Sequence, residues 1–266
     1  MQINQSVVVP MMKPQQTLLN DFMREVKKIG YPAVELWDRG PDFTEFVEAA
    51  RSNGLRIASM VGHTHESPTA GTHAEAFSRT ANHDRLVAEL KESIDVAAQN
   101  GIPGIIVLSG HRNHDETYIE TMQVCAQGLR LIAPYAEEKG VNLNLEVLNT
   151  KVDHANYAAD HTDWAVGVCE LVNSPRVKIL YDIYHMQIME GDVISTVRKA
   201  IRWIGHFHTA GVPGRQDLDD TQELNYRGIC NAIAATEYNL YVGHEFRPKG
   251  DAFQALRSAF EICNVA

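Results

Sequence analysis

Short apolar runs alternate with longer amphipathic runs along this chain, and no other feature of the sequence constrains its fold as strongly. The short runs have the length and composition of buried strands. Each is followed by a helical pattern, such as the apolar positions Leu18, Phe22, Val26 and Ile29, which are spaced by three or four residues. Eight strands are expected, at residues 6–11, 33–37, 56–62, 104–110, 142–149, 177–185, 204–211 and 240–248.

Eight strand–helix units within 266 residues predict an α/β protein with the architecture of a (β/α)8 TIM barrel rather than an open, doubly wound sheet. The length matches one such barrel, so we expect residues 1–266 to form a single domain. No GxGxxG follows the first strand and no P-loop is present, which disfavours the common nucleotide-binding folds. Glycines expected to cap the ends of helices are Gly30, Gly54, Gly101 and Gly140.

Charge and cysteine usage indicate a soluble, cytoplasmic protein that acts on a small molecule. The net charge is −10 and no basic block occurs, so neither a nucleic-acid nor a membrane partner is expected. The N-terminus does not resemble a secretory signal, and no apolar run approaches the ~18 residues that span a bilayer. The four cysteines are far apart, as is typical of buried free thiols in a reducing compartment. Assembly into a homo-oligomer stays open.

Polar residues end the last four expected strands. Glu146 lies in LNLEVLN, Asp182 in KILYDIYHMQ, His208 in IGHFHTAG and Glu245 in YVGHEFRP. Because side chains alternate along a strand and the carboxyl ends of barrel strands converge over one mouth, these four residues are expected to meet there. His206 is expected to point inward one layer below His208.

Three carboxylates in one buried pocket repel each other unless a cation lies among them. A set of three carboxylates and one imidazole suits one divalent ion such as Mn²⁺, Mg²⁺ or Co²⁺ better than a structural zinc site. Any one of these residues alone is more commonly a structural residue, and His244 is expected to face the helices. Their joint occurrence at four consecutive strand ends is what predicts a metal site.

Several segments together resemble the hydroxypyruvate isomerase family, within the wider group of xylose isomerase-like TIM barrels. They are LNLEVLN, LYDIYHMQIMEGD, HFHTAGVPGRQDL with the later ELNY, GHEFRP, PAVELW and VLSGHR. The resemblance implies the same four metal ligands, with Glu146 and Glu245 also forming a catalytic acid–base pair. It further implies that His185 contacts substrate oxygens and that Arg215 and Glu223 lie in a substrate loop.

Two features depart from that family's usual pattern. Hydroxypyruvate isomerases usually have glutamine where this chain has His208, and a histidine there resembles the ketose 3-epimerases. The first strand, QSVVVPMM, also lacks the asparagine typical of the isomerases. The resemblance implies a small hydroxy-carbonyl acid as the substrate, either hydroxypyruvate (tartronate semialdehyde) or a 2-oxo-tetronate. The two departures keep a second activity open, that of a ketose 3-epimerase.

The expected reaction moves a proton between neighbouring carbons through an enediolate, which a metal ion stabilises as a Lewis acid. Arg215 or Arg112 is a candidate to hold a substrate carboxylate, because guanidinium groups match carboxylates in bidentate fashion. Glu35 either bonds a substrate hydroxyl or braces its own loop. His63 and His65 are candidates to close the pocket.

Two other classes of protein remain as alternatives. A phosphoesterase resembling the AP endonucleases would use His65, His111, Glu146, Asp182 and His185 for part of a multi-zinc cluster. An Asp-x-His pair near the seventh strand and a basic surface for DNA are both missing from the sequence. A non-catalytic sugar-binding barrel is the third interpretation, and intact ligand residues argue against it.

Overall fold

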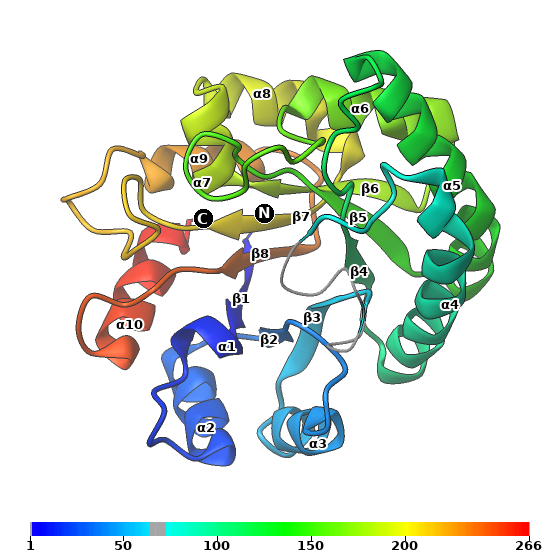
Figure 1. Cartoon of the computed structure of the whole chain (residues 1–266). Coiled ribbons are helices and arrows are strands. Elements are labelled where there is room, and N and C mark those ends of the chain that lie inside the picture. The colour runs from blue at the N-terminus through cyan, green and yellow to red at the C-terminus, as the bar shows by residue number, and fades with distance from the viewer. Residues whose placement is uncertain (1, 64–66, 68–72, 266) are drawn as a thin grey trace.

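The computed structural model describes residues 2–63, 67 and 73–265, and in them eight parallel strands close into a barrel in the order β1 to β8 (Figure 1). Closure is made by β8, which pairs with β1 through residues such as Tyr241 and Asn4. The predicted (β/α)8 TIM barrel is confirmed. The strands are β1 (Asn4–Val8), β2 (Ala33–Leu36), β3 (Arg56–Val61), β4 (Gly104–Val107), β5 (Asn142–Glu146), β6 (Val177–Asp182), β7 (Ile204–Thr209) and β8 (Tyr241–His244).

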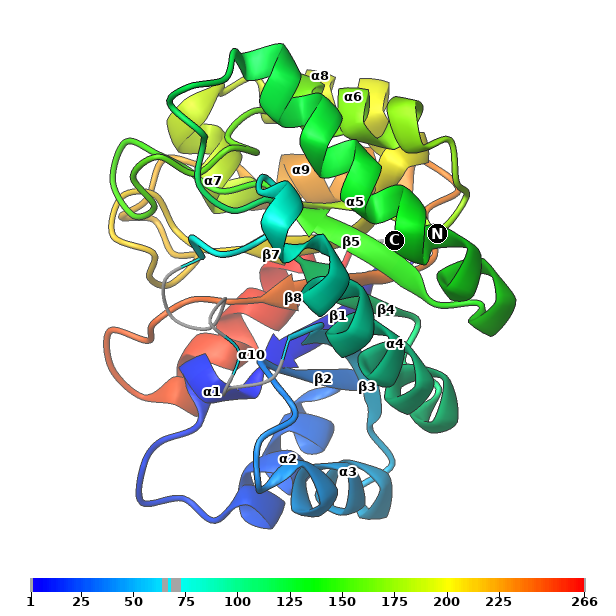
Figure 2. The same ribbon diagram turned by 45° about the vertical axis from the view of Figure 1, so that its right-hand side comes forward.

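Helices follow every strand and cover the outside of the barrel (Figure 2). Two short 3-10 helices, η1 (Thr80–Asn82) and η2 (Ile201–Trp203), precede α4 and β7 respectively. The α-helices are α1 (Val9–Met12), α2 (Leu19–Ile29), α3 (Phe43–Ser52), α4 (His83–Asn100), α5 (Tyr118–Lys139), α6 (Thr162–Val172), α7 (Ile183–Met189), α8 (Val193–Ala200), α9 (Tyr226–Ala234) and α10 (Ala252–Cys263).

The glycines expected at helix ends take those positions, with one small shift. Gly30, Gly101 and Gly140 are the C-cap residues of α2, α4 and α5, all with positive φ. In α3 the C-cap is Asn53, and Gly54 follows it with φ of 66°. Each glycine adopts a backbone conformation that a side chain would strain, which explains why the helix ends there.

All eight strands end one to four residues earlier than predicted, and for β1 and β6 the reason is that a helix begins earlier than the apolar pattern suggests. β1 ends at Val8, and Pro10 lies in the first turn of α1, where its missing N–H costs nothing. β6 ends at Asp182, whose side chain accepts a hydrogen bond from the backbone N–H of His185 and caps α7. The prediction that His185 ends a strand was therefore wrong: it lies in the first turn of a helix.

A continuous apolar core fills the space between the strands and the surrounding helices. Its largest buried side chains include Trp164 from α6, Phe22 from α2 and Tyr31 from the connection between α2 and β2. The four cysteines are free and buried, as predicted, and lie in α5, α6, α9 and α10.

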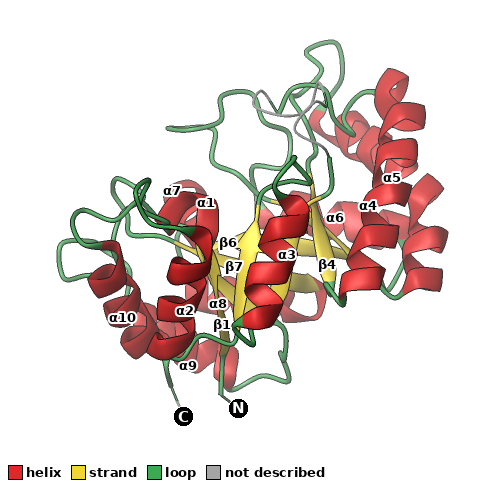
Figure 3. Ribbon diagram, turned by 90° about the horizontal axis from the view of Figure 1, so that it is seen from below, coloured by secondary structure: helices red, strands yellow, loops and turns green. Residues whose placement is uncertain are grey.

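The loops that follow the strands gather at one end of the barrel, and the two ends of the chain lie together at the other (Figure 3). Gln2 donates a hydrogen bond to Asn264 there, at 3.2 Å. None of the helices in the described part of the chain combines the length and the apolarity needed to cross a bilayer.

Candidate active site

Four buried side chains converge at the carboxyl ends of β5 to β8. Glu146 ends β5, Asp182 ends β6, His208 lies in β7 and Glu245 follows β8 directly. One ligand atom of each residue lies within 4.8 Å of those of the other three. The four expected metal ligands are thus brought together, and we refer to them as the quartet.

Burial and charge act in opposite directions on the quartet. Burial raises the pKa of Asp182 to about 7, although the positive charge of Arg215 counteracts it. Burial also opposes ionisation of Glu245, but the charges of Arg215 and His208 hold its pKa well below the usual value. For His208, burial favours the neutral form, yet Glu245 and Glu35 raise its pKa well above the usual value. The cluster is a strong site for positive charge.

Arg215 supplies part of that positive charge from the loop after β7. Its Nη2 forms an ion pair with Oε2 of Glu245 and lies 3.9 Å from Oδ2 of Asp182. The residue has φ of 55°, and its carbonyl accepts a hydrogen bond from the backbone N–H of Arg247 at 2.9 Å. This anchoring places a guanidinium group beside two of the candidate metal ligands.

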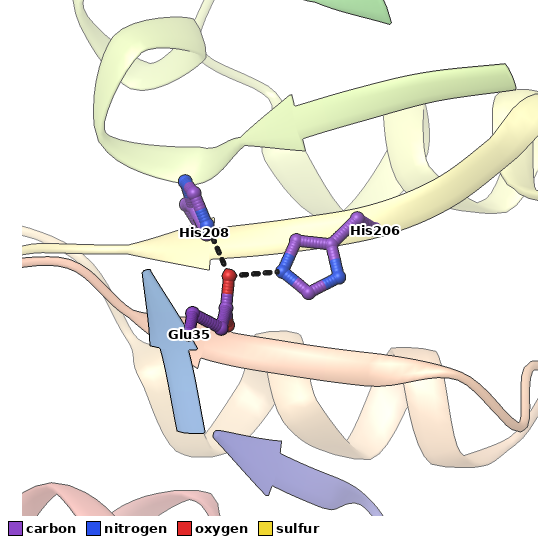
Figure 4. A group of neighbouring side chains, drawn as sticks. All are labelled: Glu35, His206 and His208. Atoms are coloured by element: carbon purple, nitrogen blue, oxygen red, sulfur yellow. Dashed lines mark hydrogen bonds and ion pairs between the residues drawn. The ribbon is translucent and has the colours of Figure 1, made fainter. Parts of the chain in front are cut away.

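The atoms of His208 fit a metal ligand. Its Nε2 lies 3.1 Å from Oε2 of Glu35, so Nε2 carries the hydrogen of that bond (Figure 4). Nδ1 is buried, lies 3.4 Å from Glu245 and 3.8 Å from Glu146, and makes no hydrogen bond to any described residue. A buried nitrogen without a partner beside three carboxylates is a donor set that could hold a divalent ion of the Mn²⁺ or Mg²⁺ type.

His185 presents one ring nitrogen to the quartet. Its Nδ1 accepts a hydrogen bond from the backbone N–H of Asn149 at 3.1 Å and lies 2.7 Å from that residue's side-chain amide. Nε2 therefore carries the proton, and it lies 3.6 Å from Oδ2 of Asp182 without a hydrogen bond in the described structure. Burial lowers the pKa of His185 well below its usual value, so the ring is neutral. Sequence analysis missed Asn149, although it ends the LNLEVLN segment.

A cavity of about 270 Å³ opens over Glu146 and Glu245. One wall is apolar and is formed by residues such as Leu108 and Leu148. Trp37 lines another part, and its indole N–H donates a hydrogen bond to Oε1 of Glu245 at 3.3 Å. Sequence analysis did not assign Trp37 to the site, although an aromatic residue at the end of β2 was the available signal. The volume suits a small molecule.

Three histidines line the cavity above the glutamates: His63, His73 and His154. Burial lowers the pKa of each, to about 4 for His63, so all three are neutral near pH 7. The rings of His73 and His154 meet edge to face, with centroids 4.9 Å apart. His63 was predicted near the pocket, and the other two were missed. His65, also predicted there, lies outside the described residues.

Two predicted substrate contacts are placed elsewhere and do not line the cavity in the described structure. Arg112 forms an ion pair with buried Asp160 at 2.6 Å and stacks over the ring of Tyr118. Glu223 is exposed and accepts a hydrogen bond from the side chain of Gln187 at 3.1 Å. For Arg112 the observed contacts are those of a residue that braces the loops.

Glu35 is buried beneath the quartet and is not among the residues described in the cavity lining. It was expected to bond a substrate hydroxyl or to brace the loop after its strand, but its hydrogen bonds join it to other strands. Its carboxylate accepts a hydrogen bond from Ser6. It accepts two more from His206 and His208 (Figure 4). His206 lies one layer below His208, as predicted. His244 points the other way, with Nε2 at 2.9 Å from the side-chain oxygen of Gln5.

A closed parallel barrel whose strands end in a buried group of residues that could hold a metal ion defines a TIM barrel, a fold in which this end of the barrel holds the active site. The chain belongs to the xylose isomerase-like TIM barrel family, whose model matches residues 23–262.

Curated relatives of the chain are named as isomerases, in agreement with the expected class. A putative hydroxypyruvate isomerase from Homo sapiens is 26% identical over 251 residues, which cover 91% of this chain and 89% of the relative. A 2-oxo-tetronate isomerase from Cupriavidus necator is 31% identical over 157 residues, which cover 59% of this chain and 60% of the relative.

Solved structures share the fold at low sequence identity. A protein titled as an AP endonuclease of family 2, from Brucella melitensis, superimposes with a TM-score of 0.83 at 21% identity, over 99% of this chain and 100% of that one. A D-psicose 3-epimerase from Clostridium cellulolyticum has a TM-score of 0.77 at 17% identity, over 98% of each chain. These likenesses establish the barrel and not the reaction.

Proposed function

We propose that this protein isomerises a small hydroxy-carbonyl acid, of the hydroxypyruvate or 2-oxo-tetronate type, with the help of one divalent metal ion. The observation that carries the proposal is the quartet, whose ligand atoms lie within 4.8 Å of one another beneath a cavity that suits a small molecule. The names of the curated relatives support the same reaction class.

The metal would be held by Glu146, Asp182, Nδ1 of His208 and Glu245. When bound, it would supply Lewis-acid stabilisation of the negative charge that develops on substrate oxygens. Mn²⁺, Mg²⁺ and Co²⁺ are the candidates, because the donor set is rich in oxygen and has a single nitrogen.

Glu146 and Glu245 are the proposed proton carriers, since both line the cavity and come from strands on different sides of the barrel. One removes the proton next to the carbonyl group, and the other returns a proton to the neighbouring carbon. Trp37 and Arg215 hold Glu245 in place through its two oxygens. Neutral His185 donates its Nε2–H to a substrate oxygen.

Arg215 is the proposed partner of the substrate carboxylate. Among the residues that the structure describes in the cavity lining, Arg215 is the one arginine, and none is a lysine. The histidines in the lining are neutral, so the positive charge there comes from Arg215. An acid would pair with its guanidinium group, whereas a neutral sugar would form only hydrogen bonds there. Arg112 and Glu223 are not needed for this proposal.

A ketose 3-epimerase is the second candidate. It is favoured by His208 and by the presence of two glutamates in one cavity, because protons taken from one face and returned to the other invert a carbon centre. The phosphoesterase alternative is weakened, because His111 joins neither of the metal-capable clusters found among the described residues. Metal analysis separates the classes: about one ion per chain fits the isomerase, and two or three zinc ions fit the phosphoesterase.

The test is a substrate panel with protein that has been stripped of metal and reloaded with Mn²⁺. Hydroxypyruvate, 2-oxo-tetronates, fructose and tagatose are incubated in D₂O and followed by NMR. Isomerisation of an acid with deuterium incorporation supports the proposal. Conversion of the ketoses alone would favour the epimerase, and no conversion of any compound, with no bound ion, would reject both.

A further inference from the structure

Below the quartet lies a second buried polar group, which shares His208 with the quartet and whose other members the proposed chemistry does not use. It consists of Glu35 from β2 and of His206 and His208 from β7 (Figure 4). Oε2 of Glu35 lies 3.0 Å from Nε2 of His206 and 3.1 Å from Nε2 of His208. We infer that Glu35 is a positioning residue, which holds His208 with Nε2–H pointing down and Nδ1 free to bind the metal ion.

The direction of the hydrogen bonds carries this inference. An ionised carboxylate can only accept, so both histidines must donate their Nε2–H to Glu35. The two imidazole rings meet at 85° with centroids 5.0 Å apart, so that both reach one oxygen from different directions. The opposite nitrogen of His208, Nδ1, then faces Glu146 and Glu245. A carboxylate behind a ligating histidine fixes its tautomer and orientation and increases its basicity.

The barrel makes room for this carboxylate. Gly243 of β8 lies against it, and a Cβ atom at that position would collide with Oε1 of Glu35 and lie 3.0 Å from Cδ2 of His208. Ser6 of β1 donates a hydrogen bond to the same Oε1 at 2.5 Å. Residues from β1, β2, β7 and β8 thus combine to place one charge beneath His208.

A second ion among Glu35, His206 and His208 is the competing interpretation, because their ligand atoms also lie within 4.8 Å of one another. The hydrogen bonds argue against it. Both oxygens of Glu35 already have donors, and the two histidine nitrogens that face Glu35 both serve as those donors. The group is satisfied without an ion, whereas Nδ1 of His208 is not.

The inference rests on the proposed metal site, and metal affinity tests it without an assay of turnover. Glu35→Gln keeps the shape of the side chain and removes its charge. The matched control is Gln5→Leu, which removes the acceptor of another buried histidine, His244, on the side of the barrel that faces the helices. Mn²⁺ affinity is measured by competition with a fluorescent chelator, and the melting temperature of each metal-free protein is recorded.

The expected result is a Kd for Mn²⁺ raised by about 10–100-fold in Glu35→Gln and unchanged in Gln5→Leu. A wild-type affinity in Glu35→Gln, or equal weakening in both variants, would overturn the positioning role and leave the metal site standing. If the wild-type protein bound no Mn²⁺, the proposed function itself would fail.

A structure of the wild-type protein with Mn²⁺ tests the same point with no substitution that affects folding. We expect Nδ1 of His208 among the ligands and Nε2 still within hydrogen-bond distance of Glu35. Ligation through Nε2, or an ion bound between Glu35 and His206, would overturn the inference.

Discussion

Replacing Asp182 by asparagine is expected to stabilise the metal-free protein above neutral pH and to abolish metal binding. Asp182 is buried among other acidic groups, and burial raises its pKa from 3.8 to about 7 against the opposing charge of Arg215. In the metal-free protein at pH 8 this carboxylate is a buried charge without full compensation. Asparagine has nearly the same shape and no charge.

The sign and size of the effect follow from the two pKa values. The folded protein binds the Asp182 proton more tightly than the unfolded chain does. The resulting stabilisation is complete below pH ~4 and is lost as the pH rises through about 7. Each pH unit in this window is worth up to ~1.4 kcal/mol, so Asp182 alone lowers the free energy of unfolding by about 3 kcal/mol between pH 5 and pH 8.

Urea unfolding in EDTA at pH 5 and pH 8 measures this quantity. We expect the variant to gain about 3 kcal/mol relative to wild type between the two pH values. The comparison uses the difference between the proteins, because a buried neutral histidine away from Asp182, such as His244, has a lowered pKa and changes the stability of both proteins in the same way.

Asp160→Asn is the matched control. Asp160 is also buried, but it forms an ion pair with Arg112 and accepts a hydrogen bond from Tyr118. Its replacement should destabilise the protein at both pH values. If Asp182→Asn destabilised the protein to the same extent at pH 5 and pH 8, the charge of Asp182 would not lower the free energy of unfolding as we infer.

Three further predictions concern turnover and metal. Glu146→Gln and Glu245→Gln should each lower kcat by about 10²–10⁴-fold, and deuterium uptake into the substrate should fall with it; full turnover in either variant contradicts the acid–base pair. Arg215→Ala should raise KM for hydroxy acids far more than for neutral ketoses, and equal increases on both would exclude a carboxylate contact. Removal of metal by EDTA should abolish turnover, and Mn²⁺ at 100 times its Kd should restore ~2.7 kcal/mol of stability, so a melting temperature that does not respond to Mn²⁺ argues against a specific site.

The convergence of the quartet was predictable because it depends only on strand order. Once eight strand–helix units define a closed barrel, the residue that ends each strand is directed to the same mouth, whatever the details of packing. Glu146 and Glu245 lie almost a hundred positions apart in the sequence, and the barrel alone brings them together.

The contacts of long side chains were less predictable. Arg112 and Arg215 have the same chemistry and both follow strands, yet one pairs with Asp160 and the other enters the quartet. His185 was expected to end a strand, and the capping of α7 by Asp182 moved it into a helix. Such choices depend on which partner lies within reach after folding, and periodicity carries no information on that.

From the sequence alone it follows that this chain folds into a barrel and gathers carboxylates and one histidine at one end of it, since apolar periodicity and strand order suffice for both. Only the tertiary structure decided that Glu35 lies beneath His208 and not in the substrate pocket, and that Asn149 determines which nitrogen of His185 carries the proton. The reason is physical: a hydrogen bond depends on the distance and direction of particular atoms, and these exist only once strands far apart in the sequence have packed together.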